Sequence, residues 1–192
     1  MPKFEDIQHS VLIVSVSRQF LEIAGRSLDP VHLVETKKSA ATARRCILER
    51  YYDLIIINAP LPDETGEELA VDITEQCRAS ILLVVPQDIY EDVAQAVTDH
   101  GILVLARPFP RGRMDKMIRF LLADQSKIRQ IENQMLALEE KLEDLRIINK
   151  AKFFLVEQKG MTEDEAHRAI GKQAMNEGVS RRRIAERIID EE

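Results

Sequence analysis

The chain has 192 residues, of which 45% are hydrophobic and 31% charged, a balance that is ordinary for a globular protein and argues against wholesale disorder. No apolar run approaches the roughly 18 to 20 residues that a membrane span needs. The first residues, Met-Pro-Lys-Phe-Glu-Asp, lack the basic-then-apolar layout of a signal peptide. We therefore expect a cytoplasmic protein with no membrane partner, long enough for one α/β domain and a smaller second element.

The formal net charge of −6 is unevenly distributed. From Arg146 to the end there are ten Lys/Arg and nine Asp/Glu, which leaves 17 and 24 upstream, a balance of −7. The last part is less acidic than the rest without being basic, so a nucleic-acid prediction has to rest on motif and clustering. Cys46 and Cys77 have no CxxC partner or neighbouring histidine, and we interpret them as reduced, partly buried core residues.

Short apolar runs alternate with helical patterns over the first 110 or so residues. The runs at 11–14, 54–57 and 81–85 are almost wholly apolar, as is typical of strands buried on both faces. Two weaker runs, 32–34 and 102–105, complete a set of five. Apolar residues at helical spacing lie between the runs, namely Ala43, Cys46 and Ile47, then Leu69, Ala70, Ile73 and Cys77, then Val93, Ala94 and Val97. This alternation predicts right-handed crossovers and a parallel sheet covered on both faces.

Residues 1–122 are predicted to form one domain, which contains the strings Asp53-Leu-Ile-Ile-Ile-Asn58 and Ala106-Arg-Pro-Phe109, with Pro62 and Gly66 between them. From about residue 8 to residue 122 this ordered set resembles the receiver domain of response regulators. It implies a flavodoxin-like α/β fold with the strand order 2-1-3-4-5.

The sequence departs from this family where phosphorylation chemistry would lie. The resemblance implies an acidic pair after the first strand to hold Mg²⁺, an aspartate ending the third strand to accept phosphate, and a Lys-Pro pair after the fifth. These positions hold Ser15, Val16, Asn58 and Arg107. An amide cannot act as the phosphoryl nucleophile, and Mg²⁺ prefers charged oxygen ligands. We predict a pseudo-receiver used for docking or dimerisation, with Asp63 as the alternative acceptor left open.

Residues 123–145 are predicted to form a coiled-coil linker helix. Apolar side chains alternate at spacings of three and four, which gives three heptads. The predicted seam consists of Ile128, Met135 and Leu142 at a, Ile131, Leu138 and Leu145 at d, and Asn149 at the next a. The pattern favours a parallel homodimer, and an amphipathic helix packed back on the receiver-like domain is the alternative. Asn149 either fixes the two-stranded register or marks the end of the seam.

Residues 146–192 are predicted to form an all-α module of three helices. Gly160 stops the preceding helix, and Thr162-Glu-Asp-Glu165 is a capping box that opens the next one. That helix ends at Gly178, and Ser180 caps the last helix.

The module contains, in order, Ile148-Asn-Lys-Ala-Lys152, Leu155, Lys159-Gly160-Met161-Thr162, Glu165-Ala166, Ile170, Ala174-Met175, Ile184-Ala185 and Ile188-Ile189. This order of residues resembles the ANTAR domain, the RNA-binding output module of bacterial transcription antitermination regulators. Gly171 departs from the family, which often has a basic residue there. The resemblance implies recognition of RNA hairpin loops, whose unstacked bases can be read.

Eight cations are candidate RNA contacts, namely Lys150, Lys152, Lys159, Arg168, Lys172, Arg181, Arg182 and Arg183. A single exposed Lys or Arg is more often only a solvated surface. Three adjacent arginines in the first turn of a helix, however, oppose the positive end of its dipole, which favours a phosphate ligand there.

The predicted function is that of a dimeric RNA-binding antitermination regulator, which stabilises hairpins in leader transcripts against a competing terminator. Its input would be a sensor protein that docks on the receiver-like domain. The alternative is a DNA-binding transcription factor that uses the last helices as a helix-turn-helix, although Glu186 and Asp190 suit a recognition helix poorly. The four histidines are scattered and no nucleophile–base pair is evident, so we expect no enzyme, no cofactor and no metal.

Overall fold

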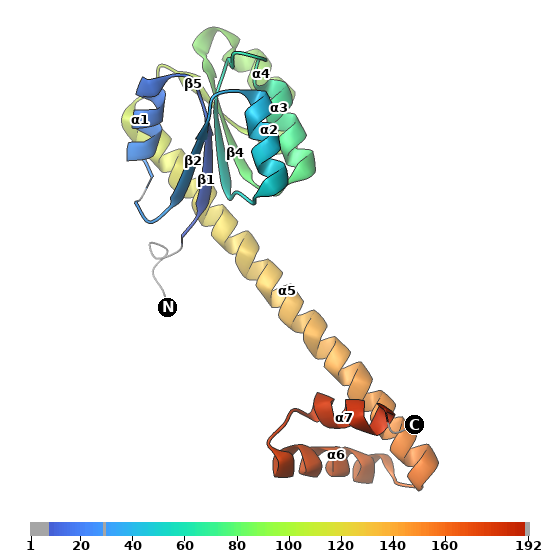
Figure 1. Cartoon of the computed structure of the whole chain (residues 1–192). Coiled ribbons are helices and arrows are strands. Elements are labelled where there is room, and N and C mark those ends of the chain that lie inside the picture. Colours follow the sequence, from blue (N-terminus) through green and yellow to red (C-terminus); the bar gives the residue numbers. More distant parts are fainter. Residues whose placement is uncertain (1–7, 29, 191–192) are drawn as a thin grey trace. The chain divides into compact units, whose positions relative to one another are not determined.

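The computed structural model describes residues 8–28 and 30–190, and the chain divides into two compact units, residues 1–129 and 130–192 (Figure 1). The helix α5 (Arg111–Lys159) supplies residues to both units. None of the helices in the described part of the chain is long and apolar enough to cross a membrane.

The first unit holds a five-stranded parallel sheet. Its strands are β1 (Ser10–Val14), β2 (Leu33–Lys37), β3 (Leu54–Asn58), β4 (Ser80–Pro86) and β5 (Leu103–Arg107). Their order, β2-β1-β3-β4-β5, confirms the prediction of a flavodoxin-like sheet. The weaker runs at 32–34 and 102–105 each begin one residue later and extend further than predicted. Polar residues continue β2 because it lies at the edge of the sheet, where the strand is partly exposed.

Helices cover both faces of this sheet (Figure 1). The helices α2 (Ala40–Glu49), α3 (Glu67–Gln76) and α4 (Tyr90–Val97) pack on one face, and α1 (Arg18–Arg26) and the first turns of α5 pack on the other. Two single 3₁₀ turns, Gln87–Ile89 and Thr98–His100, flank α4. Alternate residues of the central strands point to opposite faces, so that Leu12 and Ile55 enter one core and Ile13 and Ile56 the other.

Local signals explain where the helices of this unit begin. Ser17 and Ser39 cap α1 and α2, because their hydroxyl oxygens accept hydrogen bonds from the backbone N–H of Phe20 and Thr42 at 3.2 and 3.3 Å. Gly66 precedes α3 with φ of 95°, and a Cβ there would lie 3.2 Å from Cβ of Ala59. Only glycine satisfies both the backbone conformation and the space.

Polar contacts hold α5 to the sheet up to the end of the first unit. The Gln125 side chain is buried and donates from Nε2 to the Arg78 carbonyl at 2.8 Å and to Ser80 Oγ at 3.0 Å. Ser126 Oγ lies 3.3 Å from Nε2 of His9, just before β1. Residues 123–129 thus pack with the sheet domain, and the second unit begins after them.

Near the end of the first unit, Arg129 of α5 contacts Asp53, a buried carboxylate next to the start of β3. Its Oδ2 accepts a hydrogen bond from the Ser10 backbone N–H at 2.8 Å, and its Oδ1 lies 2.5 Å from the Arg129 guanidinium. Nδ1 of His9 lies 3.5 Å from the same carboxylate. A buried carboxylate needs such partners, because an unpaired charge in the interior is costly.

The second unit contains the last part of α5 with α6 (Glu163–Glu177) and α7 (Arg181–Asp190). The predicted signals are confirmed: α5 ends before Gly160 with φ of 63°, the Thr162–Glu165 capping box is complete, and α6 ends at Gly178 with φ of 65°. Ser180 Oγ accepts from the Arg183 backbone N–H at 3.2 Å, as expected of a cap. The three helices share a small apolar core of Ala151, Leu155, Ala166, Ile170, Ala174, Ile184 and Ala185.

Candidate functional site

The carboxyl edge of the sheet carries a neutral hydrogen-bonded pair. Ser15 follows β1 and Asn58 ends β3, and both are buried. Nδ2 of Asn58 donates to Ser15 Oγ at 3.0 Å, and the backbone N–H of Ser17 donates to the same oxygen at 3.1 Å. Val16 is exposed and contributes no polar group. A hydroxyl and an amide are weak ligands for Mg²⁺, so these residues do not fit the metal site that a phosphorylated receiver requires.

Arg107 ends β5 at the same edge of the sheet. Its Nη2 donates to the Ala59 carbonyl at 2.6 Å, one residue beyond Asn58. Among the described residues, Arg107 Nε and Asn58 Oδ1 are both buried without a hydrogen-bond partner. The guanidinium is therefore directed to the backbone after β3.

Asp63 has a structural role in the loop after β3. Its two oxygens accept hydrogen bonds from the backbone N–H groups of Ala40 and Ala41, at 2.9 and 3.0 Å. The amides of Ala41 and Ala40 hold the pKa of this carboxyl below its usual value. Asp63 thus caps the N-terminus of α2 across 22 residues or more of chain, and both oxygens are engaged.

An ion-pair network ties the same loop and α3 to α2. Arg44 of α2 lies 2.6 Å from Glu64 and 2.6 Å from Asp72. The Glu64 carboxylate also accepts from the Leu69 backbone N–H at 2.9 Å. Together with Asp63, these contacts hold the segment from the loop to α3 against α2.

Most of the predicted seam residues are exposed in the single chain. Ile131, Met135, Leu138, Leu142 and Leu145 keep between 51% and 59% of their surface exposed, and Asn149 is exposed as well. Ile128 is half-buried. Leu136, which lies outside the a and d positions, is 63% exposed. Solvent exposure of five apolar side chains at heptad spacing is what an unpaired coiled-coil strand presents.

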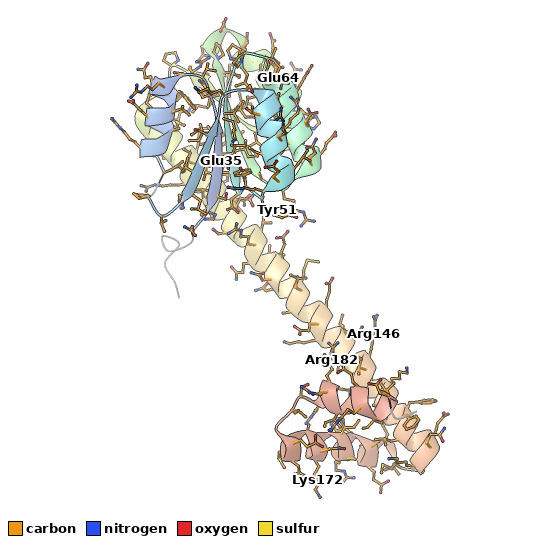
Figure 2. The ribbon with its side chains drawn as sticks, viewed as in Figure 1. Glu35, Tyr51, Glu64, Arg146, Lys172 and Arg182 are labelled. Atoms are coloured by element: carbon orange, nitrogen blue, oxygen red, sulfur yellow. The ribbon has the colours of Figure 1, made fainter. Side chains whose placement is uncertain are left out.

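The eight predicted RNA contacts fall into two groups in the second unit. Lys152 and Arg182 are engaged in ion pairs, and Arg168 donates to the backbone of its own helix. The other five are exposed and make no ion pair within the described chain, namely Lys150, Lys159, Lys172, Arg181 and Arg183. Figure 2 places Lys172 and Arg182 on opposite sides of the module. Three of the predicted cations are therefore engaged within the module, and five are exposed.

Arg182 links α7 to α5. Its guanidinium lies 2.7 Å from Glu186 of α7 and 3.0 Å from Asp144 of α5, and hydrogen bonds to these two carboxylates raise its pKa. The positive charge at the start of α7 opposes the helix dipole, and from the sequence we expect an RNA phosphate to offset it. In the structure, carboxylates of the chain itself offset part of this charge. The spacing of four between Arg182 and Glu186 is visible in the sequence, whereas Asp144 becomes a neighbour only through the fold.

The Arg181 side chain lies beside Gly171 of the preceding helix, α6. A Cβ built on Gly171 of α6 would be 3.6 Å from both Nε and Nη2 of Arg181. The missing side chain at Gly171 leaves space beside this guanidinium. Where the ANTAR family often has a basic residue, this chain thus has Gly171, with the Arg181 guanidinium of α7 beside it.

The first unit has the fold of a receiver domain, and residues 136–189 match the family described as the ANTAR domain. The chain therefore carries an ANTAR domain after a receiver-like domain. Its curated relatives include the transcriptional regulatory protein PdtaR of Mycobacterium tuberculosis strain H37Rv, which is 26% identical over 139 residues, covering 72% of this chain and 67% of the relative.

Solved structures support the fold of the first unit. The signal receiver domain of an HD domain-containing protein from Pseudomonas fluorescens Pf-5 is similar with a TM-score of 0.58 and 22% identity, covering 64% of this chain and 93% of that one. The chemotaxis response regulator CheY4 of Vibrio cholerae is similar with a TM-score of 0.53 and 22% identity, covering 60% and 99%. At this identity the likeness establishes the fold alone.

Proposed function

We propose that this chain is a dimeric, RNA-binding regulator of transcription antitermination, which binds hairpins in leader transcripts. The observation that carries the proposal is the ANTAR match over residues 136–189, on a three-helix module with five exposed cations free of ion pairs within the described chain. The similarity to a protein titled a transcriptional regulatory protein agrees with it.

The proposed mechanism is a competition between RNA structures. A protein that binds one hairpin and not the alternative terminator favours that hairpin. The free-energy shift grows by about 1.4 kcal/mol for each tenfold rise of the free protein concentration above the dissociation constant. Lys150, Lys172 and Arg183 supply the positive charge that RNA phosphates require, and Arg181 supplies a planar guanidinium suited to phosphates and to unpaired bases. No catalytic step is needed.

Dimerisation through α5 would raise the avidity of the module. Burial of the exposed apolar residues Ile131, Met135, Leu138, Leu142 and Leu145 supplies the driving force. Two modules held together bind two sites on one transcript with a higher effective concentration than separate modules.

The receiver-like domain would act in this scheme without aspartyl phosphorylation. The neutral Ser15–Asn58 pair supports this part of the proposal, because it offers no carboxylate, either to accept a phosphoryl group or to bind Mg²⁺ as a charged ligand. The domain is then a docking platform for a sensor protein.

Recovery and sequencing of transcripts crosslinked to the full chain in cells would test the function, followed by titration of an enriched leader hairpin in vitro. We expect hairpin binding whose affinity falls with salt. A plot of the logarithm of the association constant against the logarithm of the salt concentration should have a slope of about −0.7 to −0.9 for each phosphate contacted. Duplex DNA carrying the sequence of the hairpin stem is the matched control. Equal affinity for this duplex would favour the DNA-binding alternative, and enrichment of no hairpin-bearing transcript would refute the proposal.

A further inference from the structure

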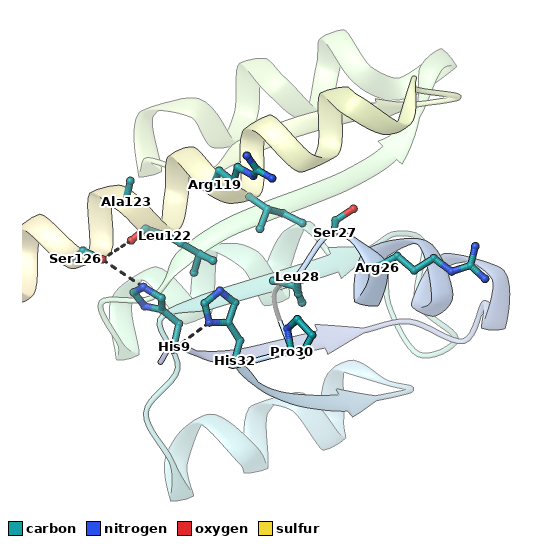
Figure 3. A pocket seen from close by; sticks show the side chains of 11 residues that line it. His9, Arg26, Ser27, Leu28, Pro30, His32, Arg119, Leu122, Ala123 and Ser126 are labelled. Carbon is teal, nitrogen blue, oxygen red and sulfur yellow. Dashed lines mark hydrogen bonds between the residues drawn. The ribbon is translucent and has the colours of Figure 1, made fainter. Parts of the chain in front are cut away.

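The first unit contains a cavity of about 630 Å³, between the end of α1, the start of β2 and α5 (Figure 3). His9, which lines it, precedes β1, whereas Ser15 of the neutral pair follows that strand. The cavity therefore lies at the end of the sheet opposite to the degenerate phosphorylation site. Its volume is in the range of about 300 to 1,000 Å³ that is usual for small-molecule sites.

One wall of the cavity is apolar. Leu28, Ile118 and Leu122 line it, and all three belong to the core that packs α1 and α5 on the sheet. These side chains offer a fixed surface for a hydrocarbon group.

Two histidines lie side by side at one end, next to Ser126 (Figure 3). The Ser126 hydroxyl donates to the Leu122 carbonyl at 3.0 Å, and its oxygen lies 3.3 Å from Nε2 of His9. The backbone N–H of His9 donates to Nδ1 of His32 at 3.4 Å. Nδ1 of His32 is thus engaged as an acceptor, which leaves Nε2 as the ring nitrogen available to a ligand.

Two arginines also line the cavity, Arg26 of α1 and Arg119 of α5, and Figure 3 shows their side chains apart from one another. Both are exposed, and neither makes an ion pair within the described part of the chain.

We propose that this cavity is a binding site for a small organic anion with an apolar body, a carboxylate or a phosphate ester. The anionic group would lie at one of these two guanidinium groups, Arg26 or Arg119, because guanidinium groups pair strongly with carboxylates and phosphates. The hydrocarbon part would lie over Leu122 and Ile118, toward His32. Such a ligand bridges α1 and α5, and it contacts α5 directly before Gln125, Ser126 and Arg129 hold that helix to the sheet. This site is independent of the RNA-binding proposal.

The test is calorimetric titration of the full chain with two probes, hexanoate and hexyl phosphate. Inorganic phosphate and hexanol are the half-ligands, since the first lacks the hydrocarbon and the second lacks the charge. We expect saturable binding of at least one amphiphilic anion with a dissociation constant of about 1 mM or tighter, and at least about tenfold weaker binding of both half-ligands. Binding of neither anion, or equal binding of hexanol, would overturn the proposal.

Variants locate the site. The double variant R26Q/R119Q should lower the affinity for the anion at least about tenfold and leave a cooperative melting transition, since both side chains are exposed. R113Q, which removes an exposed arginine of α5 that does not line the cavity, is the matched control and should bind normally. An equal loss in R113Q, or no loss in the double variant, would refute the assignment to this cavity.

Discussion

The substitution L138K tests whether the exposed stripe on α5 is a dimer seam. Leu138 occupies a d position and is 59% exposed in the single chain. In a parallel coiled coil each d side chain inserts between residues of the facing helix. The variant places a charge at that position in both copies, and the desolvation of two facing lysines opposes association.

The exposed fraction sets the size of the effect. Full burial of a leucine contributes about 1.5 to 3 kcal/mol, and somewhat more than half of this is still available at Leu138. The two copies in a dimer therefore lose about 2 to 4 kcal/mol in total. This corresponds to a dissociation constant raised roughly thirtyfold to a thousandfold, before any repulsion between the lysines.

Sedimentation equilibrium over a range of protein concentrations measures this change. L136K is the matched control, because it makes the same chemical change two residues away, at a b position that faces outward from the seam and is 63% exposed. We expect L136K to remain dimeric under conditions in which L138K is monomeric. A dimer of unchanged affinity in L138K, or equal weakening in both variants, would refute the heptad assignment.

Four further outcomes are expected. Incubation with acetyl phosphate and Mg²⁺ should add no mass by mass spectrometry, and a stoichiometric aspartyl phosphate would contradict the pseudo-receiver. R183A should weaken hairpin binding by about tenfold with an unchanged melting temperature, whereas R182A, which leaves Asp144 and Glu186 unpaired, should lower the melting temperature instead. Burial holds the pKa of His9 below 6.5 against the opposing effect of Asp53, so the unfolded chain binds the proton more readily. The free energy of unfolding should then fall as the pH drops below about 6.5, with a smaller slope in H9Q; equal slopes would dismiss His9 as the cause. G171A should stabilise the second unit by about 1 kcal/mol, since a Cβ there meets only ordinary contacts, and a lower melting temperature would show that Arg181 needs the space.

Local chemistry made much of the fold predictable. The central strands β1, β3 and β4 are buried on both faces, so nearly every residue in them had to be apolar. The ends of α6 were predictable because Thr162 with Glu165 and then Gly178 are signals read over four residues or fewer. The edge strand β2 was the least clear in the sequence, since its exposed positions accept polar residues.

Contacts between residues far apart in the chain were not predictable. The pairing of Arg129 with the buried Asp53 joins residues far apart in the sequence, and Arg129 belongs to no motif that would have pointed to it. The same holds for Arg182 and Asp144. Of the eight predicted RNA contacts, sequence alone could therefore not separate the cations that hold the module together from those left exposed to solvent.

The contacts that join the loop after β3 to α2 also have a consequence for hydrogen exchange. Asp63 binds the first amides of α2, and Arg44 of that helix binds Glu64 and Asp72. Opening the first turn of α2 therefore requires the loop carboxylates to lose their partners at the same time. The amide protons of Ala40 and Ala41 should be protected from exchange to a degree unusual for the start of a surface helix. Their protection should fall together with that of the Leu69 amide, which Glu64 holds, so that the segment opens as one cooperative unit.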